Sequence, residues 1–85
     1  MKTLTINLTA PLKEELNISG RVAAVNRTSI ERLLNKVKEK VNKWLLFGEA
    51  DMDVMLNDTG EIVASGKYEY NIFAGRGNYE IKFAA

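Results

Sequence analysis

Three acidic side chains in close succession are the residues best suited to chemistry in this sequence: Glu49, Asp51 and Asp53. Two of these carboxylates would share one face of an extended strand, and carboxylate oxygens are the ligands that Mg²⁺ and Ca²⁺ prefer. No glycine-bounded ligand loop accompanies them, so the pattern is more typical of the solvated start of a strand. We predict neither a metal site nor a cofactor, and a divalent-cation site is the alternative left open.

Catalysis by a serine or cysteine nucleophile that is activated by histidine is excluded by composition. The chain contains no histidine and no cysteine, so Ser19, Ser29 and Ser65 have no imidazole to activate them. The stretch from Gly60 to Tyr68 carries the glycines and the lysine of a phosphate-binding loop. Its glycines are spaced one residue too far apart, however, and Tyr68 stands where that motif needs Ser or Thr to hold Mg²⁺. We therefore predict that the protein is not an enzyme.

The balance of charges gives limited support for nucleic acid as a partner. The 85 residues carry 12 Lys and Arg against 11 Asp and Glu, a formal net charge of +1. No strong overall field therefore attracts polyanions. Cations nevertheless gather on one side of a predicted helix, and a further arginine lies between two glycines in a loop, where both groups could contact phosphates. This alternative nucleic-acid site consists of Arg32, Lys36, Lys40, Lys43 and Arg76.

One long amphipathic helix is predicted from Ser29 to Phe47. Apolar side chains recur there at helical spacing and fall on one arc. The residues of this arc are Ile30, Leu33, Leu34, Val37, Val41, Trp44 and Leu45. Thr28 and Glu31 form a capping box at the start of the helix, and Gly48 can adopt the left-handed conformation just beyond its end.

The rest of the chain alternates between apolar and polar residues in the manner of β-strands. The expected strands cover residues 3–9, 51–57, 62–72 and 79–83. Gly66 would mark a bulge or a close contact with the helix. Residues 10–27 are the least determined part of the chain. A short turn followed by a strand from Arg21 to Asn26 is favoured there over a backward extension of the helix.

These elements predict a single α+β domain over residues 1–85, with one helix on one face of a mostly antiparallel sheet of about four to five strands. The expected order is β-β-α-β-β-β. The core is expected to comprise the helical arc together with Leu4, Ile6, Leu8, Val22, Ala24, Val54, Leu56, Ile62, Ala64, Tyr68, Tyr70, Ile81 and Phe83. One helix covers only one face of such a sheet, so the opposite face, hereafter the open face, is left for function.

A protein-binding surface is predicted on the open face. Met55, Val63 and Phe73 are apolar residues in the strand phase opposite to the helix, while Arg76 and Tyr79 belong to residue types enriched at interfaces. Singly exposed apolar residues are common, but a group of them on one face favours association. We therefore expect a non-enzymatic protein-binding module. It would act as an inhibitor or adaptor of a larger partner or as a homo-oligomer, with nucleic-acid binding as the alternative.

Nothing in the sequence predicts export or membrane insertion. Polar residues interrupt the aliphatic ones between Thr3 and Thr9, so no signal-peptide core is present there. The longest apolar run, Trp44–Phe47, is far too short to span a bilayer. The lack of cysteine fits a reducing compartment. We expect a cytoplasmic protein that makes no contact with membranes.

Overall fold

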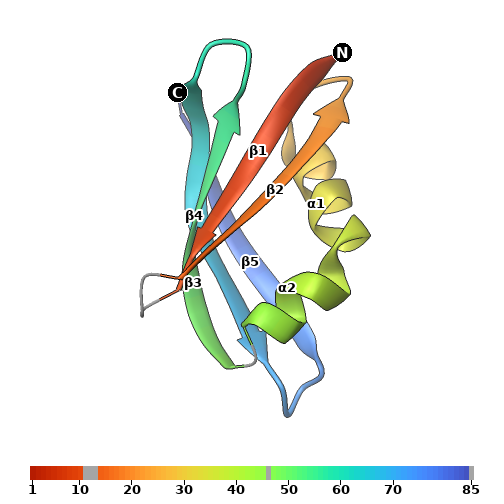
Figure 1. The fold of residues 1–85 in the computed structure, drawn as a ribbon, viewed down its shortest axis with the longest axis vertical. Coiled ribbons are helices and arrows are strands. Elements are labelled where there is room, and N and C mark those ends of the chain that lie inside the picture. The colour runs from red at the N-terminus through yellow and green to blue at the C-terminus, as the bar shows by residue number, and fades with distance from the viewer. Residues whose placement is uncertain (11–13, 46, 85) are drawn as a thin grey trace.

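The described part of the chain, residues 1–10, 14–45 and 47–84, forms two helices and five strands in a computed structural model (Figure 1). In chain order the elements are β1 (Lys2–Thr9), β2 (Glu15–Val22), α1 (Arg27–Lys36), α2 (Lys38–Trp44), β3 (Phe47–Leu56), β4 (Glu61–Asn71) and β5 (Arg76–Phe83). The predicted order β-β-α-β-β-β is confirmed only in part, because two helices stand where one was expected.

All of the described strands belong to one antiparallel sheet with the spatial order β2-β1-β3-β4-β5. The hairpins β1–β2, β3–β4 and β4–β5 join strands that follow one another in sequence. In contrast, β1 pairs with β3 although β2 and both helices lie between these two strands in the sequence. The helices pack on one face, hereafter the covered face, so the α+β class is confirmed (Figure 1).

The start of α1 differs from the predicted capping box. Asn26 is the N-cap, and its Oδ1 accepts a hydrogen bond from the backbone N–H of Ser29 at 2.9 Å. The prediction of a capping box formed by Thr28 and Glu31 was wrong, because Thr28 already lies inside the first turn of α1. Asparagine caps a helix as well as threonine does, so Asn26 can serve as the N-cap two residues before Thr28.

The predicted unbroken helix is interrupted at Val37, which is the C-cap of α1 and the N-cap of α2. Its φ of −121° and ψ of 20° are not helical. The two helices run in different directions, and the change of direction follows the curl of the sheet (Figure 1). α1 holds Leu33 against Gly20 of β2, whereas α2 holds Asn42 beside Tyr68 of β4. One straight helix does not satisfy both contacts, so that prediction was wrong.

The predicted end of the helix was also wrong. α2 ends at Trp44 with Leu45 as its C-cap, and β3 already begins at Phe47. Gly48 has a φ of +109°, as expected for glycine, but it lies within β3 rather than beyond a helix end.

β2 lies earlier in the chain than predicted, at Glu15–Val22 instead of residues 21–26. It pairs with β1 along its whole length and buries Ile18 and Val22 on the covered face. Ala24, predicted to be in the core, follows the strand and is exposed. Asn17 and Ser19 lie in the region ahead of Arg21 where a short turn was predicted. They occupy the solvent-facing positions of an edge strand, where polar residues are normal. Residues 11–13 lie outside the described residues.

The core lies between the covered face and the helices. Its fully buried side chains are Leu4, Ile6, Leu8, Ile30, Val41, Met52 and Val54. These residues come from β1, both helices and β3, so the predicted strand phase is confirmed for the middle of the sheet. Leu56, Tyr70 and Ile81 were expected in the core and are only half-buried.

A β-bulge near the start of β4 explains another wrong core assignment. Val54 faces Ala64, but the next residue, Met55, faces Ile62, so Val63 is the extra residue. For the residues of β4 that precede the bulge, the side chains that would face the core now face away from it. Ile62 is therefore 47 % exposed instead of buried. Phe83, also predicted in the core, is 43 % exposed because it lies at the end of the edge strand β5.

Two glycines permit close packing on the covered side and between strands. A Cβ on Gly20 would overlap the side chain of Leu33, so glycine lets α1 approach β2 closely. A Cβ on Gly66 would overlap the backbone carbonyl of Glu80, so glycine lets β5 approach β4. The close approach predicted at Gly66 is therefore to a strand and not to the helix.

Neither of the helices in the described part of the chain is long and apolar enough to cross a lipid bilayer.

Candidate functional site

The open face is polar. Facing residues of β1, β3, β4 and β5 form one row across it, which consists of Thr9, Asp51, Lys67 and Glu80. The adjacent row consists of Asn7, Asp53, Ser65 and Lys82. Charges of opposite sign therefore face each other along the first row, which stabilises cross-strand pairs. These two rows do not contain the apolar patch that the sequence analysis predicted for this face.

Two acidic residues near the start of β3, Glu49 and Asp51, lie beside Lys67 of β4. The Nζ atom of Lys67 lies 3.0 Å from Oε1 of Glu49, and this hydrogen bond raises the pKa of Lys67 above its usual value. Asp51 directly faces Lys67. Among the described residues, no three Asp, Glu, His or Cys side chains are grouped so that they could hold a metal ion.

The residues predicted for protein binding are divided between the two ends of β4. Met55 faces Ile62 near the bulge, where Val63 packs against the core. Phe73 is in the turn between β4 and β5 and is 90 % exposed. Arg76 is the first residue of β5 and is exposed as well.

Tyr79 lies on the covered side of β5 and is half-buried. The Arg27 guanidinium carbon lies 6.0 Å from the centre of the Tyr79 ring, at the distance of a cation–π contact. Burial is the main reason why the pKa of Tyr79 is raised, and the negative charge of Glu31 acts in the same direction. The helix α1 thus contacts β2 through Leu33 and β5 through Arg27, so the curled sheet brings both of its edges to this helix.

The β4–β5 turn is an ordered element that exposes apolar side chains. The Oδ1 of Asn71 accepts a hydrogen bond from the backbone N–H of Phe73 at 2.9 Å. Gly75 has a φ of +68°, which glycine adopts without strain. Ile72 is 51 % exposed beside Phe73. The sequence analysis had placed Ile72 at the end of the strand expected over residues 62–72 and missed its exposure.

The free edge of β5 offers main-chain hydrogen-bonding groups. The backbone N–H of Ala84 donates to the carbonyl of Val63 at 2.9 Å, which places Phe83 in a non-hydrogen-bonded pair with β4. Because antiparallel ladders alternate, the N–H and C=O groups of Tyr79, Ile81 and Phe83 point away from β4. No described strand lies on that side of β5.

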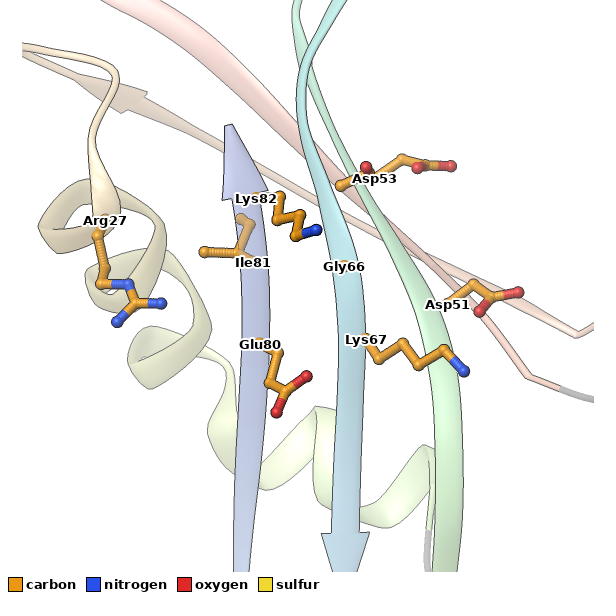
Figure 2. A pocket seen from close by; sticks show the side chains of 9 residues that line it. Arg27, Asp51, Asp53, Gly66, Lys67, Glu80, Ile81 and Lys82 are labelled. Carbon is orange, nitrogen blue, oxygen red and sulfur yellow. The ribbon is translucent and has the colours of Figure 1, made fainter. Parts of the chain in front are cut away.

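Side chains alternate along β5. Glu80 and Lys82 project towards the open face, whereas Ile81 projects to the opposite side (Figure 2). Tyr79 and Phe83 share the phase of Ile81, so the covered side of this edge strand carries an apolar row.

The hollow drawn in Figure 2 has a volume of about 650 Å³ and lies around β4 and β5. Its charged lining residues are Arg27, Asp51, Asp53, Lys67, Glu80 and Lys82. Acidic and basic side chains are equally represented, so the hollow favours no particular charge in a ligand.

The predicted nucleic-acid residues are not assembled into one site. Arg32 and Lys36 of α1 line a hollow of about 310 Å³ together with Arg21 of β2, a residue that the sequence analysis did not single out. Lys40 and Lys43 belong to α2, beyond the break at residue 37, and Arg76 lies in the distant β4–β5 hairpin. The helix break therefore separates the cations that an unbroken helix would have aligned.

No protein-family model, curated protein or solved structure matches this chain.

Proposed function

We propose that this protein is a non-enzymatic protein-binding module, acting as an inhibitor or adaptor, and that it binds through the free edge of β5 and the adjoining β4–β5 turn. This surface, hereafter the β5 edge, includes Phe73, Arg76 and Tyr79, which the sequence also singled out. The single observation that carries the proposal is the free edge itself, an edge strand with no described partner on its outer side.

The chemistry of this edge fits the addition of an extended peptide. Outward N–H and C=O groups of Tyr79, Ile81 and Phe83 would bond to the backbone of a partner strand, as in β-strand addition. The strand contains no proline and pairs with β4 in an unbroken register, so neither a proline nor a bulge interrupts its edge. Phe83 and the turn residue Phe73 add exposed apolar surface next to it.

Selection of extended peptides tests the proposal directly. We expect that peptides selected from a random linear library by their binding to the protein will shift the NMR amide signals of Tyr79, Ile81 and Phe83. Ile81→Pro removes a backbone N–H that makes no hydrogen bond to β4. It should therefore weaken peptide binding about tenfold, because one main-chain hydrogen bond to the peptide is lost. Ile81→Val is the matched control, because it shortens the side chain and keeps the N–H.

Phe73→Asp reports on the turn. Phe73 is 90 % exposed, so this change should leave the fold intact while it weakens binding of the same peptides. A change at Val63 would be a poor probe, because that side chain packs against the core. Peptides that shift only open-face signals, or that bind Ile81→Pro as tightly as the unchanged protein, would show that the β5 edge is not the binding surface.

A second candidate function, binding of a nucleic-acid phosphate backbone, is favoured by the hollow between β2 and α1. Arg21, Arg32 and Lys36 line it, and no acidic residue does. The only ion pair between described residues involves Lys67 and Glu49, far from these cations in the sequence. Three positive charges around one hollow, with no acidic residue among its described lining residues, favour an anion there.

For this second candidate, Arg32→Glu combined with Lys36→Glu should abolish binding of a short DNA or RNA duplex at low salt. Lys40→Glu combined with Lys43→Glu, on α2, is the matched control with the same change in net charge. Each lost phosphate contact should reduce the slope of log affinity against log salt by about 0.9. Equal losses in both double variants would indicate attraction by net charge alone and would count against a site in the hollow.

A further inference from the structure

We infer that the β5 edge binds a second copy of this chain, with β5 of one protomer antiparallel to β5 of its partner and with Ile81 on the two-fold axis. The inference rests on the proposed function, because it names the partner for the same edge. The resulting dimer would continue the sheet of one protomer into that of the other.

The backbone phase of β5 permits this pairing. The N–H and C=O of Ile81 both point to the free edge, so two copies of this residue can exchange both hydrogen bonds around a two-fold axis. In the same register Tyr79 of one protomer faces Phe83 of the other, and their outward main-chain groups also meet. The apolar row of one edge strand thereby covers the apolar row of the other, including the 43 % exposed Phe83.

The charges on the open face select this register. With Ile81 on the axis, Glu80 of each protomer faces Lys82 of the partner copy, and opposite charges directly across a pair of strands are favourable. Glu80 already ends the row in which Asp51 and Lys67 face each other, so the partner's lysine would extend the alternation of charge by one strand. The edge of β5 is thus complementary to itself.

Neighbouring registers are disfavoured by the same charges. An axis through Glu80 places this carboxylate against its own copy, and an axis through Lys82 does the same for the ammonium groups. An axis through Tyr79 places Lys82 opposite Arg76 of the other copy. Of the registers centred on residues 79 to 82, only the one centred on Ile81 places opposite charges across from each other. A register centred on Asn78 would pair Glu80 with Arg76, but it places Tyr79 opposite Gly77 and so does not bring the two apolar rows together.

The other edge of the sheet carries its charges differently. The central open-face residues of β2, Asn17 and Ser19, are uncharged, and the opposite charges that could face each other in a β2–β2 pair, Glu15 and Arg21, lie near the two ends of the strand. Charged residues directly beside the two-fold axis are therefore a feature of β5.

Charge reversal in a mixing experiment tests the register. Glu80→Lys and Lys82→Glu each place like charges at both cross-strand positions, so sedimentation velocity should show dimerisation about tenfold weaker or worse for either variant alone. A one-to-one mixture should recover the dimer, because both facing positions in the mixed dimer again hold opposite charges. The recovery also shows that both variants are folded.

A cysteine at position 81 gives an independent measurement in a chain that has no other cysteine. Facing residues of a hydrogen-bonded pair lie about 5.5 Å apart between Cα atoms, within the range that a disulfide spans. Ile81→Cys should therefore form a covalent dimer under mild oxidation, and Asn17→Cys on β2 should not.

The outcomes separate this inference from the proposed function. Recovery of the dimer on mixing, with cross-linking at position 81 only, supports self-association through β5. The inference is overturned if the chain stays monomeric at high concentration, or if neither charge reversal changes the affinity of the dimer. If a monomeric chain still binds selected peptides at Tyr79, Ile81 and Phe83, the protein-binding function stands with a different partner.

Discussion

Replacing Gly66 with alanine is expected to destabilise the protein by about 3 kcal/mol, a large part of the total for a domain of this size. The new Cβ would overlap the carbonyl of Glu80 and approach the Cα of Ile81. These are backbone atoms that cannot rotate away, so β4 and β5 would have to separate. Chemical denaturation followed by circular dichroism measures the loss in the free energy of unfolding.

Gly20→Ala is the comparison for this prediction. A Cβ at that position would meet the end of the Leu33 side chain, which can change its rotamer, so the expected loss is smaller, about 1 kcal/mol. Gly66→Ala without a measurable loss would show that β5 is not held against β4 as described. It would remove the basis for both proposals at the β5 edge.

Replacing Ile6 with alanine is expected to cost about 3 to 4 kcal/mol in the free energy of unfolding. Ile6 is fully buried on β1, between Ile18 and Val54 on the neighbouring strands, so the deleted methyl and methylene groups leave a cavity that the sheet cannot collapse to fill. The same denaturation measurement applies, with Trp44 fluorescence as a second probe of the covered face.

The matched change is Ile62→Ala, which deletes the same atoms from a side chain that is 47 % exposed. It is expected to cost less than about 1 kcal/mol. The contrast tests the bulge at residue 63, because without the bulge Ile62 would share the covered face with Ala64. Equal losses at both positions would contradict the register of β3 against β4.

Simple alternation predicted the middle of the sheet well. Leu4, Ile6 and Leu8 are all fully buried, as a period of two requires when one face is covered. Val54 on β3 follows the same rule. The prediction failed at Ile62 because a bulge changes the phase without leaving a residue type that signals it.

The helical region shows a different limit. The apolar arc correctly predicted burial of Ile30, Leu33, Leu34 and Val41, although the helix breaks between them. The break at Val37 comes with a change in helix direction that follows the curl of the sheet, and this curl is a property of the whole fold (Figure 1). No proline or glycine marks it, so local sequence rules did not find it.

The candidate site was only partly accessible from sequence. Phe73 was expected at a strand position on the open face and Arg76 in a loop, whereas the structure places Phe73 in the β4–β5 turn and Arg76 at the start of β5. The outward phase of the β5 backbone depends on its register with β4. Residue types give no information about hydrogen-bonding phase. For the same reason, the proposed pairing of Glu80 with Lys82 across a two-fold axis could be inferred only from the free edge of β5.

The pairing of β1 with β3 has a consequence for how the chain reaches its native state. Leu4 pairs with Leu56, so the seam in the middle of the sheet joins residues separated by more than half of the chain. The two flanking units, the β1–β2 hairpin and the β3–β4–β5 meander, can each form from neighbours in sequence. Closing the seam costs the loop entropy of the residues between them, so we expect it to be the slow step of folding, after which the helices can dock.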